Sequence, residues 1–593
     1  MIRVSDYVVS FLESHAVSDV FMLSGGFCLP LVDAIGKSNI NHICNLHEQA
    51  AAVAAEAYAQ YKNLPGVCLV TAGPGGTNTV TGVASAWLDS IPMIFLSGQV
   101  QSRDLKRDRG VRQIGFQEID MVSIVESITK YAVTLTDPRD IKYIMERAWH
   151  EATSGRQGPV WIEIPLDIQS AMIDVDSLKG YPIPYKREKN KYLGKLVGEF
   201  YKMISVSKRP IMLAGNGIRS AAAEERFLHL AKLLKIPVMT TWKAIDFMDE
   251  DDPLFVGRPG LVGQRGANFS QQTADLFISI GARLDYGQTA FNHANFARRA
   301  KKIIVDIDQF EIAKMDFDID CSINFDALDF INEAIAQYPE VKDFSGWLEQ
   351  CKEWQGRYPV VQPEYWKQES HVDNYVFVDV LSDLMRPSDL LIPGSSGACS
   401  EVTMQAFRAK KGMRIFNSEG LGSMGFGIAA AIGGCIAASK RHTICVDGDG
   451  GFVMNIQELE TVRRLQLPIK FFVLNNGGYV SIRNSQKKHF DLELASSEEG
   501  GVTLPSFEKI SKSYDINYCK IENQKNIHKE IQAVLAADGP VICEIMMLHT
   551  HTTSPKNGTF KKEDGTFESL PMEDLLPRLP REEFERNMAV ASE

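Results

Sequence analysis

The sequence predicts an α/β protein of three domains, in which parallel sheets are covered by helices on both faces. Its 593 residues are too many for one hydrophobic core and correspond to about three domains at roughly 150 to 200 residues each. Near-continuous apolar runs alternate with amphipathic stretches, and such runs are typical of parallel strands that are buried on both sides. Examples are PGVCLVTAGPGG, RPIMLAGNGI, DLFISIGARLD, KKIIVDID and HTICVDGDG.

Two segments interrupt this alternation and divide the chain. They lie at about 176 to 195 and 338 to 370, where polar and proline-containing sequence predicts linkers. The predicted blocks are a first domain over 1–175, a central domain over 190–340, a third domain over 370–548 and a C-terminal tail over 549–593. The run DVFMLSGGF at position 19 weakly resembles DLLIPGSSG at position 389, which is compatible with a duplicated fold.

Composition and charge exclude several classes of protein. With 45% hydrophobic and 23% charged residues, the chain has the composition of an ordinary globular protein without a membrane span. The N-terminus, MIRVSDYVVSFLESHAVSD, is amphipathic and acidic, so it lacks the features of a signal peptide. Ten cysteines without a C-x-x-C pair favour reduced thiols and a cytoplasmic location. A net charge of −12 without a basic block argues against nucleic acid or membrane partners and leaves small-molecule substrates.

Two strand-like runs in the third block, VDGDGGFVMN and FFVLNN, end in small polar residues. The segment between them, NIQELETVRRLQLP, has apolar residues on one helical face, and Asn455 is expected to cap that helix with Glu458 three positions later. Parallel strands end at the same edge of a sheet, so the Asp449 carboxylate and the Asn476 amide can share one Mg²⁺ ion. The neighbouring glycines would let main-chain N–H groups approach a diphosphate. Glycine, aspartate and asparagine are also ordinary turn formers, which is the simpler interpretation.

The spacing of these two motifs resembles the signature of thiamine diphosphate-dependent enzymes, and the flanking sequence is similar to their acetohydroxyacid synthase branch. The resemblance extends over about residues 1 to 548. It rests on motifs that occur in the family's order: LHEQAAAVAAEAYAQ, TAGPGGTNTVTGVASAWLDSIPMIFLSGQV, GFQEIDMV, GPVWIEIPLDI, GARLDYGQTA and EGLGSMGFGIAAAIG. It implies a pyrimidine-binding first domain, a central domain and a diphosphate-binding third domain. It also implies a homodimer or homotetramer with active sites between subunits.

The resemblance assigns roles to individual residues. Glu48 would hydrogen-bond the aminopyrimidine ring and promote ionisation of the cofactor, with Gln117 as a second catalytic group and Phe116, Lys130 and Ser485 facing the substrate. Mg²⁺ would be held by Asp449, Asn476 and Gly478. The expected cofactor-binding residues are Gly26, Ser395, Ser396, Gly422, Met424, Gly448, Asp449, Gly450, Gly451, Asn476, Gly478 and Tyr479.

The central domain and the tail leave alternatives open. Acetohydroxyacid synthases carry FAD in the central domain, and Arg283, Asp306 and Glu311 fall in matching segments, but relatives without flavin keep similar segments. AGNGIRS gives only a weak dinucleotide signal, because the third glycine is missing. His549 and His551 are expected to be exposed and not to bind a metal.

The expected activity is decarboxylation of a 2-oxo acid, pyruvate in the first place, and transfer of the two-carbon unit to a carbonyl acceptor. Ser485 stands where acetohydroxyacid synthases carry a tryptophan that selects a small 2-oxo acid, and Ser24 and Phe27 also depart from the family's pattern. A larger polar acceptor such as a keto sugar is therefore predicted. The alternatives are a true acetolactate synthase, a nonoxidative 2-oxo acid decarboxylase and a binding protein that has lost catalysis.

Overall fold

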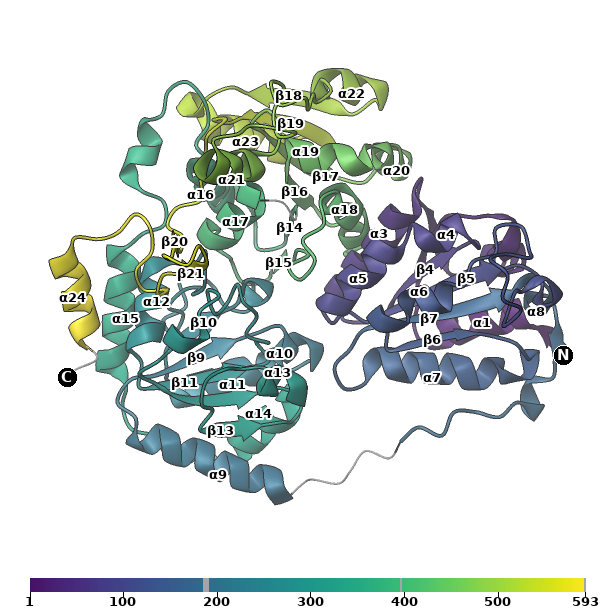
Figure 1. The fold of residues 1–593 in the computed structure, drawn as a ribbon, viewed down its shortest axis with the longest axis horizontal. Helices are drawn as coiled ribbons and strands as arrows, with labels where there is room; N and C mark the ends of the chain where they lie inside the picture. The colour runs from purple at the N-terminus through teal and green to yellow at the C-terminus, as the bar shows by residue number, and fades with distance from the viewer. Residues whose placement is uncertain (185–190, 395–396, 591–593) are drawn as a thin grey trace.

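A computed structural model describes residues 1–184, 191–394 and 397–590, and shows three sheets flanked by helices (Figure 1). The first sheet has six parallel strands in the order β3-β2-β4-β5-β7-β6. Their bounds are β2 (Asp19–Met22), β3 (Asn41–Cys44), β4 (Gly66–Val70), β5 (Met93–Gln99), β6 (Tyr131–Thr134) and β7 (Pro159–Pro165). The central strands are buried along their whole length, as their continuous apolar sequence predicts.

The sheet of the third domain repeats this topology. Its parallel strands follow the order β15-β14-β16-β17-β19-β18, which is the order of the first sheet with each strand replaced by its counterpart. The strands are β14 (Leu390–Pro393), β15 (Arg414–Ile415), β16 (Thr443–Gly448), β17 (Ile469–Asn475), β18 (Asn517–Ile521) and β19 (Val541–Met546). The two similar runs at 19 and 389 form the corresponding strands β2 and β14. The duplicated fold is confirmed at the level of strand order.

The central domain holds a five-stranded parallel sheet in the order β10-β9-β11-β12-β13. Its strands are β9 (Pro210–Ala214), β10 (Val238–Thr240), β11 (Leu276–Ile280), β12 (Lys301–Val305) and β13 (Cys321–Ile323). The linker prediction for 338–370 is wrong over much of its length, because helix α15 (Ser345–Arg357) buries Trp347, Cys351 and Trp354 in the core of this domain. These side chains recur at helical spacing and make the segment part of the core. The other predicted linker lies partly outside the described residues.

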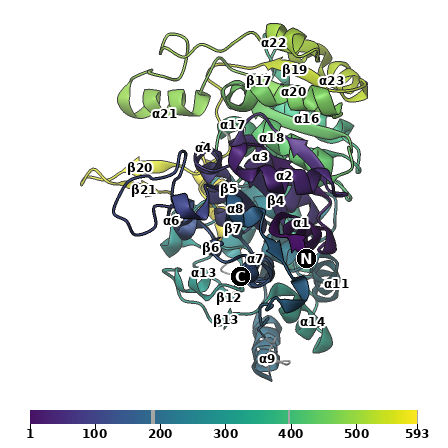
Figure 2. The same ribbon diagram turned by 90° about the vertical axis from the view of Figure 1, so that its right-hand side faces the viewer.

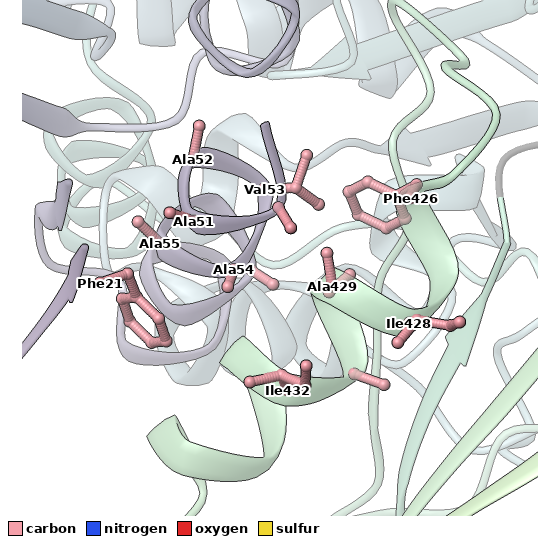
Figure 3. Close-up of a cluster of buried hydrophobic side chains, with 14 of the residues drawn as sticks. Phe21, Ala51, Ala52, Val53, Ala54, Ala55, Phe426, Ile428, Ala429 and Ile432 are labelled. Carbon is pink, nitrogen blue, oxygen red and sulfur yellow. The ribbon is translucent and has the colours of Figure 1, made fainter. Parts of the chain in front are cut away.

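Two helices join the first and third domains. Helix α3 (Glu48–Lys62) packs its alanine-rich surface against α18 (Phe426–Ala437), as Figure 3 shows. A Cβ atom at Gly433 would lie 1.9 Å from the carbonyl oxygen of Ala54, so only glycine permits this approach of the two backbones. The contact fixes the helix that begins at Glu48.

The C-terminal tail is folded along the central domain. Strands β20 (Thr559–Lys561) and β21 (Phe567–Ser569) form a hairpin that projects from the molecule (Figure 2). Helix α24 (Arg581–Ala589) packs beside α12 (Arg265–Thr273) and α15, where Trp354 donates a hydrogen bond of 3.0 Å to Asn587. No helix in the described part of the chain is long and apolar enough to cross a membrane.

Candidate active site

Asp449 and Asn476 lie at the ends of neighbouring strands, as the sequence predicts. Strands β16 and β17 pair in parallel with Gly448 opposite Leu474, so both strands end at the same edge of the sheet. One carboxylate oxygen of Asp449 accepts hydrogen bonds from the main-chain N–H groups of Asn476 and Gly478, both at 3.0 Å. The other accepts from the N–H of Gly450 at 2.7 Å. The aspartate therefore ties the two motifs into one loop cluster.

The polar atoms of this cluster fit a small divalent cation. Burial raises the pKa of Asp449 to about 6, because the desolvation penalty outweighs its hydrogen bonds to main-chain N–H groups. The side-chain oxygen of Asn476 is buried without a hydrogen-bond partner among the described residues. A cation would stabilise the carboxylate and give the amide oxygen a partner. Oxygen-only ligands of this kind suit Mg²⁺. No group of three His, Cys, Asp or Glu side chains among the described residues has an arrangement that could hold a metal ion instead.

Glycines give this cluster its close backbone packing. At Gly450 a Cβ atom would lie 2.2 Å from the ring of Tyr479, and at Gly478 it would lie 2.4 Å from the carbonyl oxygen of Ser496. Gly478 also has φ of +126°, a conformation that residues with side chains rarely adopt. These two glycines are required by local packing, so their presence alone does not identify a phosphate site.

A cavity of about 270 Å³ opens beside the cluster. Of the expected cofactor residues it is lined by Gly422, Met424, Gly448, Asp449, Gly450, Gly451, Asn476, Gly478 and Tyr479. Gly26 lies in the first domain and does not line it. Ser395 and Ser396 lie outside the described residues. The third domain thus brings most of the predicted cofactor residues around one space.

Two expectations about neighbouring residues are wrong. Asn455 lies at a kink between helical segments, where its side chain donates to the Gly425 carbonyl at 2.8 Å and accepts from the Gln457 side chain at 3.1 Å, so it is not used as the expected helix cap. Glu458 instead accepts hydrogen bonds from the Leu46 N–H at 2.8 Å and the His47 N–H at 3.1 Å, which ties the third domain to the start of α3. His551 is not exposed: its side chain is 11% accessible and lines the cavity.

Glu48 is the first residue of α3, and His47 caps that helix by accepting the Gln49 N–H. The Glu48 side chain is buried and accepts a 2.9 Å hydrogen bond from the Asn78 amide, which orients the carboxylate. Within one chain Glu48 does not line the cavity beside Asp449. The two acidic groups therefore belong to separate surfaces of the described chain.

The predicted substrate residues are dispersed in the single chain. Phe116 is 79% exposed, and Gln117 adopts a left-handed φ of 63° in the same loop. Lys130 donates a 2.6 Å hydrogen bond to the carbonyl of Ser154 and lines a different cavity, so its role toward substrate stays a prediction. Ser485 is exposed on helix α21 (Val480–Phe490), whose first turn lines the Asp449 cavity.

A second cavity region lies at the carboxyl ends of β9, β11 and β12. Its parts measure about 130 and 490 Å³ and share Arg156, Arg283, Glu311 and other residues. The strand order changes direction between β9 and β11, which is where dinucleotides bind in such sheets. Asp306 follows β12, and burial raises its pKa to about 6. Acidic and cationic groups suitable for ribose hydroxyls and phosphates thus meet at this edge.

Comparison with known proteins places this geometry in a family. Residues 2–124, 197–333 and 395–545 match the N-terminal TPP binding domain, the central domain and the C-terminal TPP binding domain of thiamine pyrophosphate enzymes. The chain belongs to this family. The enzyme is 33% identical to a probable acetolactate synthase large subunit of Methanocaldococcus jannaschii, over 92% of this chain and 91% of that protein. It is 31% identical to the acetolactate synthase large subunit of Cyanidium caldarium, over 92% and 94%. It is 30% identical to the isozyme 1 large subunit of Escherichia coli, over 91% and 93%.

This protein is therefore a thiamine diphosphate-dependent enzyme of the acetolactate synthase type. The cavity beside Asp449 lies in the region that matches the C-terminal TPP binding domain, and Glu48 lies in the region that matches the N-terminal one. The three matches follow one another along the chain as the N-terminal, central and C-terminal domains of the family.

Proposed function

We propose that this enzyme decarboxylates pyruvate and transfers the two-carbon unit to an acceptor that is larger and more polar than a 2-oxo acid, such as a keto sugar. The observation that carries the proposal is Ser485 on α21. This exposed residue lies on a helix whose first turn, Val480 to Ile482, lines the Asp449 cavity. A serine in place of an indole leaves room and adds a hydrogen-bond donor and acceptor.

The residues of the third domain would hold the diphosphate end of the cofactor. Asp449, the Asn476 amide oxygen and the Gly478 carbonyl would bind Mg²⁺, which in turn would bind the diphosphate. Thiamine diphosphate, when bound, supplies the carbanion chemistry that the protein's own side chains cannot provide. The support is the buried side-chain oxygen of Asn476, which has no hydrogen-bond partner among the residues described, and the raised pKa of Asp449.

Glu48 would act at the other end of the cofactor. Its carboxyl group would share a proton with a nitrogen of the aminopyrimidine ring, and Asn78 would keep that carboxyl in place. Gln117 would donate a hydrogen bond to oxygen atoms that gain negative charge during the reaction. Its left-handed backbone is consistent with a functional constraint on this loop.

A site that needs both Glu48 and Asp449 would form between two copies of the chain. Within one chain Glu48 is absent from the Asp449 cavity, and Phe116 projects into solvent. A homodimer, or a tetramer made of two such dimers, would bring the first domain of one subunit to the third domain of the other. The exposed Phe116 would then face the partner's cavity.

The second cavity region would hold FAD in a structural role. Asp306 would accept hydrogen bonds from ribose hydroxyls, while Arg156 and Arg283 would lie near the diphosphate. A flavin absorbance spectrum of the purified protein tests this assignment.

We also propose a cytoplasmic location, because all ten cysteines are free thiols.

A competition assay tests the acceptor. The enzyme is incubated with pyruvate, thiamine diphosphate, Mg²⁺, 2-oxobutyrate and a nucleotide-linked 4-keto sugar, and the products are identified by mass. The sugar adduct is expected to dominate. Ser485→Trp should shift the products toward acetohydroxy acids, because the indole narrows the pocket, whereas the control Lys487→Trp on the exposed side of α21 should not.

Each alternative activity predicts a different product. Acetohydroxy acids without sugar adduct would show a true acetolactate synthase, and free acetaldehyde would show a nonoxidative decarboxylase. If the protein binds its cofactor but forms no product, it is a binding protein that has lost catalysis.

A further inference from the structure

Arg483 on helix α21 makes an unusual set of contacts for a buried cation. Its residue is only 7% exposed. All five of its side-chain hydrogen bonds in the described part of the chain end on main-chain carbonyl oxygens, and none ends on a carboxylate. Buried charges in proteins are normally paired, so this guanidinium lacks the usual neutralising partner.

The carbonyl oxygens that it contacts come from three separate segments. The first is the loop after β17, where the Asn476 oxygen accepts at 3.0 Å and the Gly477 oxygen at 3.5 Å. The second is Ser496, at 3.4 Å, whose oxygen also accepts the Tyr479 N–H at 2.8 Å. The third is His549 in the segment after β19, at 2.6 and 3.1 Å. One planar guanidinium therefore connects the loop that carries Asn476 to the Ser496 and His549 segments beside it.

Arg483 and Asp449 hold the two peptide units that flank the Asn476 side chain. The N–H of Asn476 donates to Asp449 while its carbonyl oxygen accepts from Arg483. Between these two peptide units the side-chain oxygen of Asn476 is buried, has no hydrogen-bond partner in the described part of the chain and can accept a cation. The rigid fork of arginine suits this task, and lysine has no equivalent planar geometry.

The charge of Arg483 also fits the expected ligand. A diphosphate bears more negative charge than one Mg²⁺ neutralises, so a buried cation near the metal loop would contribute to the balance of charge in the loaded site. In the described chain the positive charge is compensated only by carbonyl dipoles.

We propose that Arg483 is a positioning residue of the metal and diphosphate site, which orients Asn476 and joins α21 and the His549 segment to the metal loop. The inference rests on the proposed metal site at Asp449 and Asn476. It assigns to Arg483 a role in cofactor affinity and not in the chemical step.

Calorimetric titration of Mg²⁺ in the presence of thiamine diphosphate tests the proposal on the full-length protein. The variants are Arg483→Gln, which removes the charge and the fork, and Arg483→Lys, which keeps only the charge. Loss of a residue that orients a metal ligand lowers metal affinity by about 10- to 100-fold, and Arg483→Gln is expected in that range with Arg483→Lys between it and the wild type. The turnover number at saturating Mg²⁺ and cofactor should stay within a few-fold of the wild type.

Two controls separate the possible failures. Lys487→Gln removes an exposed cation of the same helix, which forms an ion pair with Asp491, and should leave Mg²⁺ affinity unchanged. Asp449→Ala should abolish Mg²⁺ binding. If Mg²⁺ affinity is unchanged in Arg483→Gln but lost in Asp449→Ala, the inference about Arg483 is wrong and the proposed metal site stands. Unchanged affinity in Asp449→Ala would overturn the metal site itself. If circular dichroism shows that Arg483→Gln does not fold, the test uses Arg483→Lys alone. A wild-type Mg²⁺ affinity in Arg483→Lys would contradict the need for the planar guanidinium.

Discussion

Replacing Glu56 by glutamine should make the protein more stable, and increasingly so as the pH rises from 5 to 8. Glu56 lies on α3, fully buried, with one carboxylate oxygen accepting from Gln60 at 3.1 Å and the other without a partner among the described residues. Burial, with a contribution from the Asp89 charge, raises its pKa from 4.5 to about 8, and Lys243 opposes this only in part.

The sign follows from proton binding. Between these two pKa values the folded state keeps a proton that the unfolded state releases, so the free energy of unfolding falls as the pH rises. Each pKa unit corresponds to about 1.4 kcal/mol, which gives a penalty on the order of 3 kcal/mol at pH 8 relative to pH 5. Glutamine does not titrate, keeps the shape and avoids the penalty.

Thermal unfolding of the wild type and Glu56→Gln at pH 5, 6.5 and 8 measures this effect. The melting temperature of the variant should exceed that of the wild type by a margin that grows with pH. Glu460→Gln is the matched control, because Glu460 lies on the outer face of α20 (Leu459–Leu465), paired with Arg463 at 2.6 Å, and has a lowered pKa. A constant difference between Glu56→Gln and the wild type across this range would refute the reasoning.

Three further predictions concern the site and the helix pair that supports it. Glu48→Gln should bind thiamine diphosphate but exchange the C2 proton of the cofactor orders of magnitude more slowly, and an unchanged rate by NMR would remove this role. Asp449→Ala should lose thiamine diphosphate affinity along with Mg²⁺, since the cation links protein and phosphate; wild-type cofactor affinity in excess EDTA would contradict the metal site. Gly433→Ala should destabilise the protein by about 2 kcal/mol or more, because its Cβ would meet the Ala54 carbonyl oxygen at 1.9 Å; Gly346→Ala, at an open position of α15, should cost nothing, and equal melting temperatures for the two variants would argue against the close helix contact.

The strand ends of the third domain could be predicted because they depend on local sequence. Apolar runs define β16 and β17, and parallel pairing then places Asp449 beside Asn476. The three sheets were predictable for the same reason. The resemblance to the family predicted most of the other expected cofactor residues that line the cavity beside Asp449.

Contacts between distant segments could not be read from local patterns. Glu458 stands three residues after Asn455, as in a helix cap, yet its carboxylate accepts N–H groups from the first domain. His551 lies in polar sequence, and only the fold of the segment after β19 places its ring in the cavity. Trp347 and Trp354 do show a helical repeat, and this signal in 338–370 would have identified α15 as part of the core.

The tail that completes the central domain has a consequence for biosynthesis. Met572 and Met588 belong to the same core as Phe269 and Trp354, and Asn268 donates a 2.7 Å hydrogen bond to the Met572 carbonyl. The ribosome makes these methionines more than 200 residues after Trp354. At a translation rate of roughly 5 to 20 residues per second, the core of the central domain stays incomplete for on the order of 10 to 50 s after Trp354 is made. During translation its apolar surface stays uncovered for that interval, so the nascent chain should bind chaperones until Met572 and Met588 have been added.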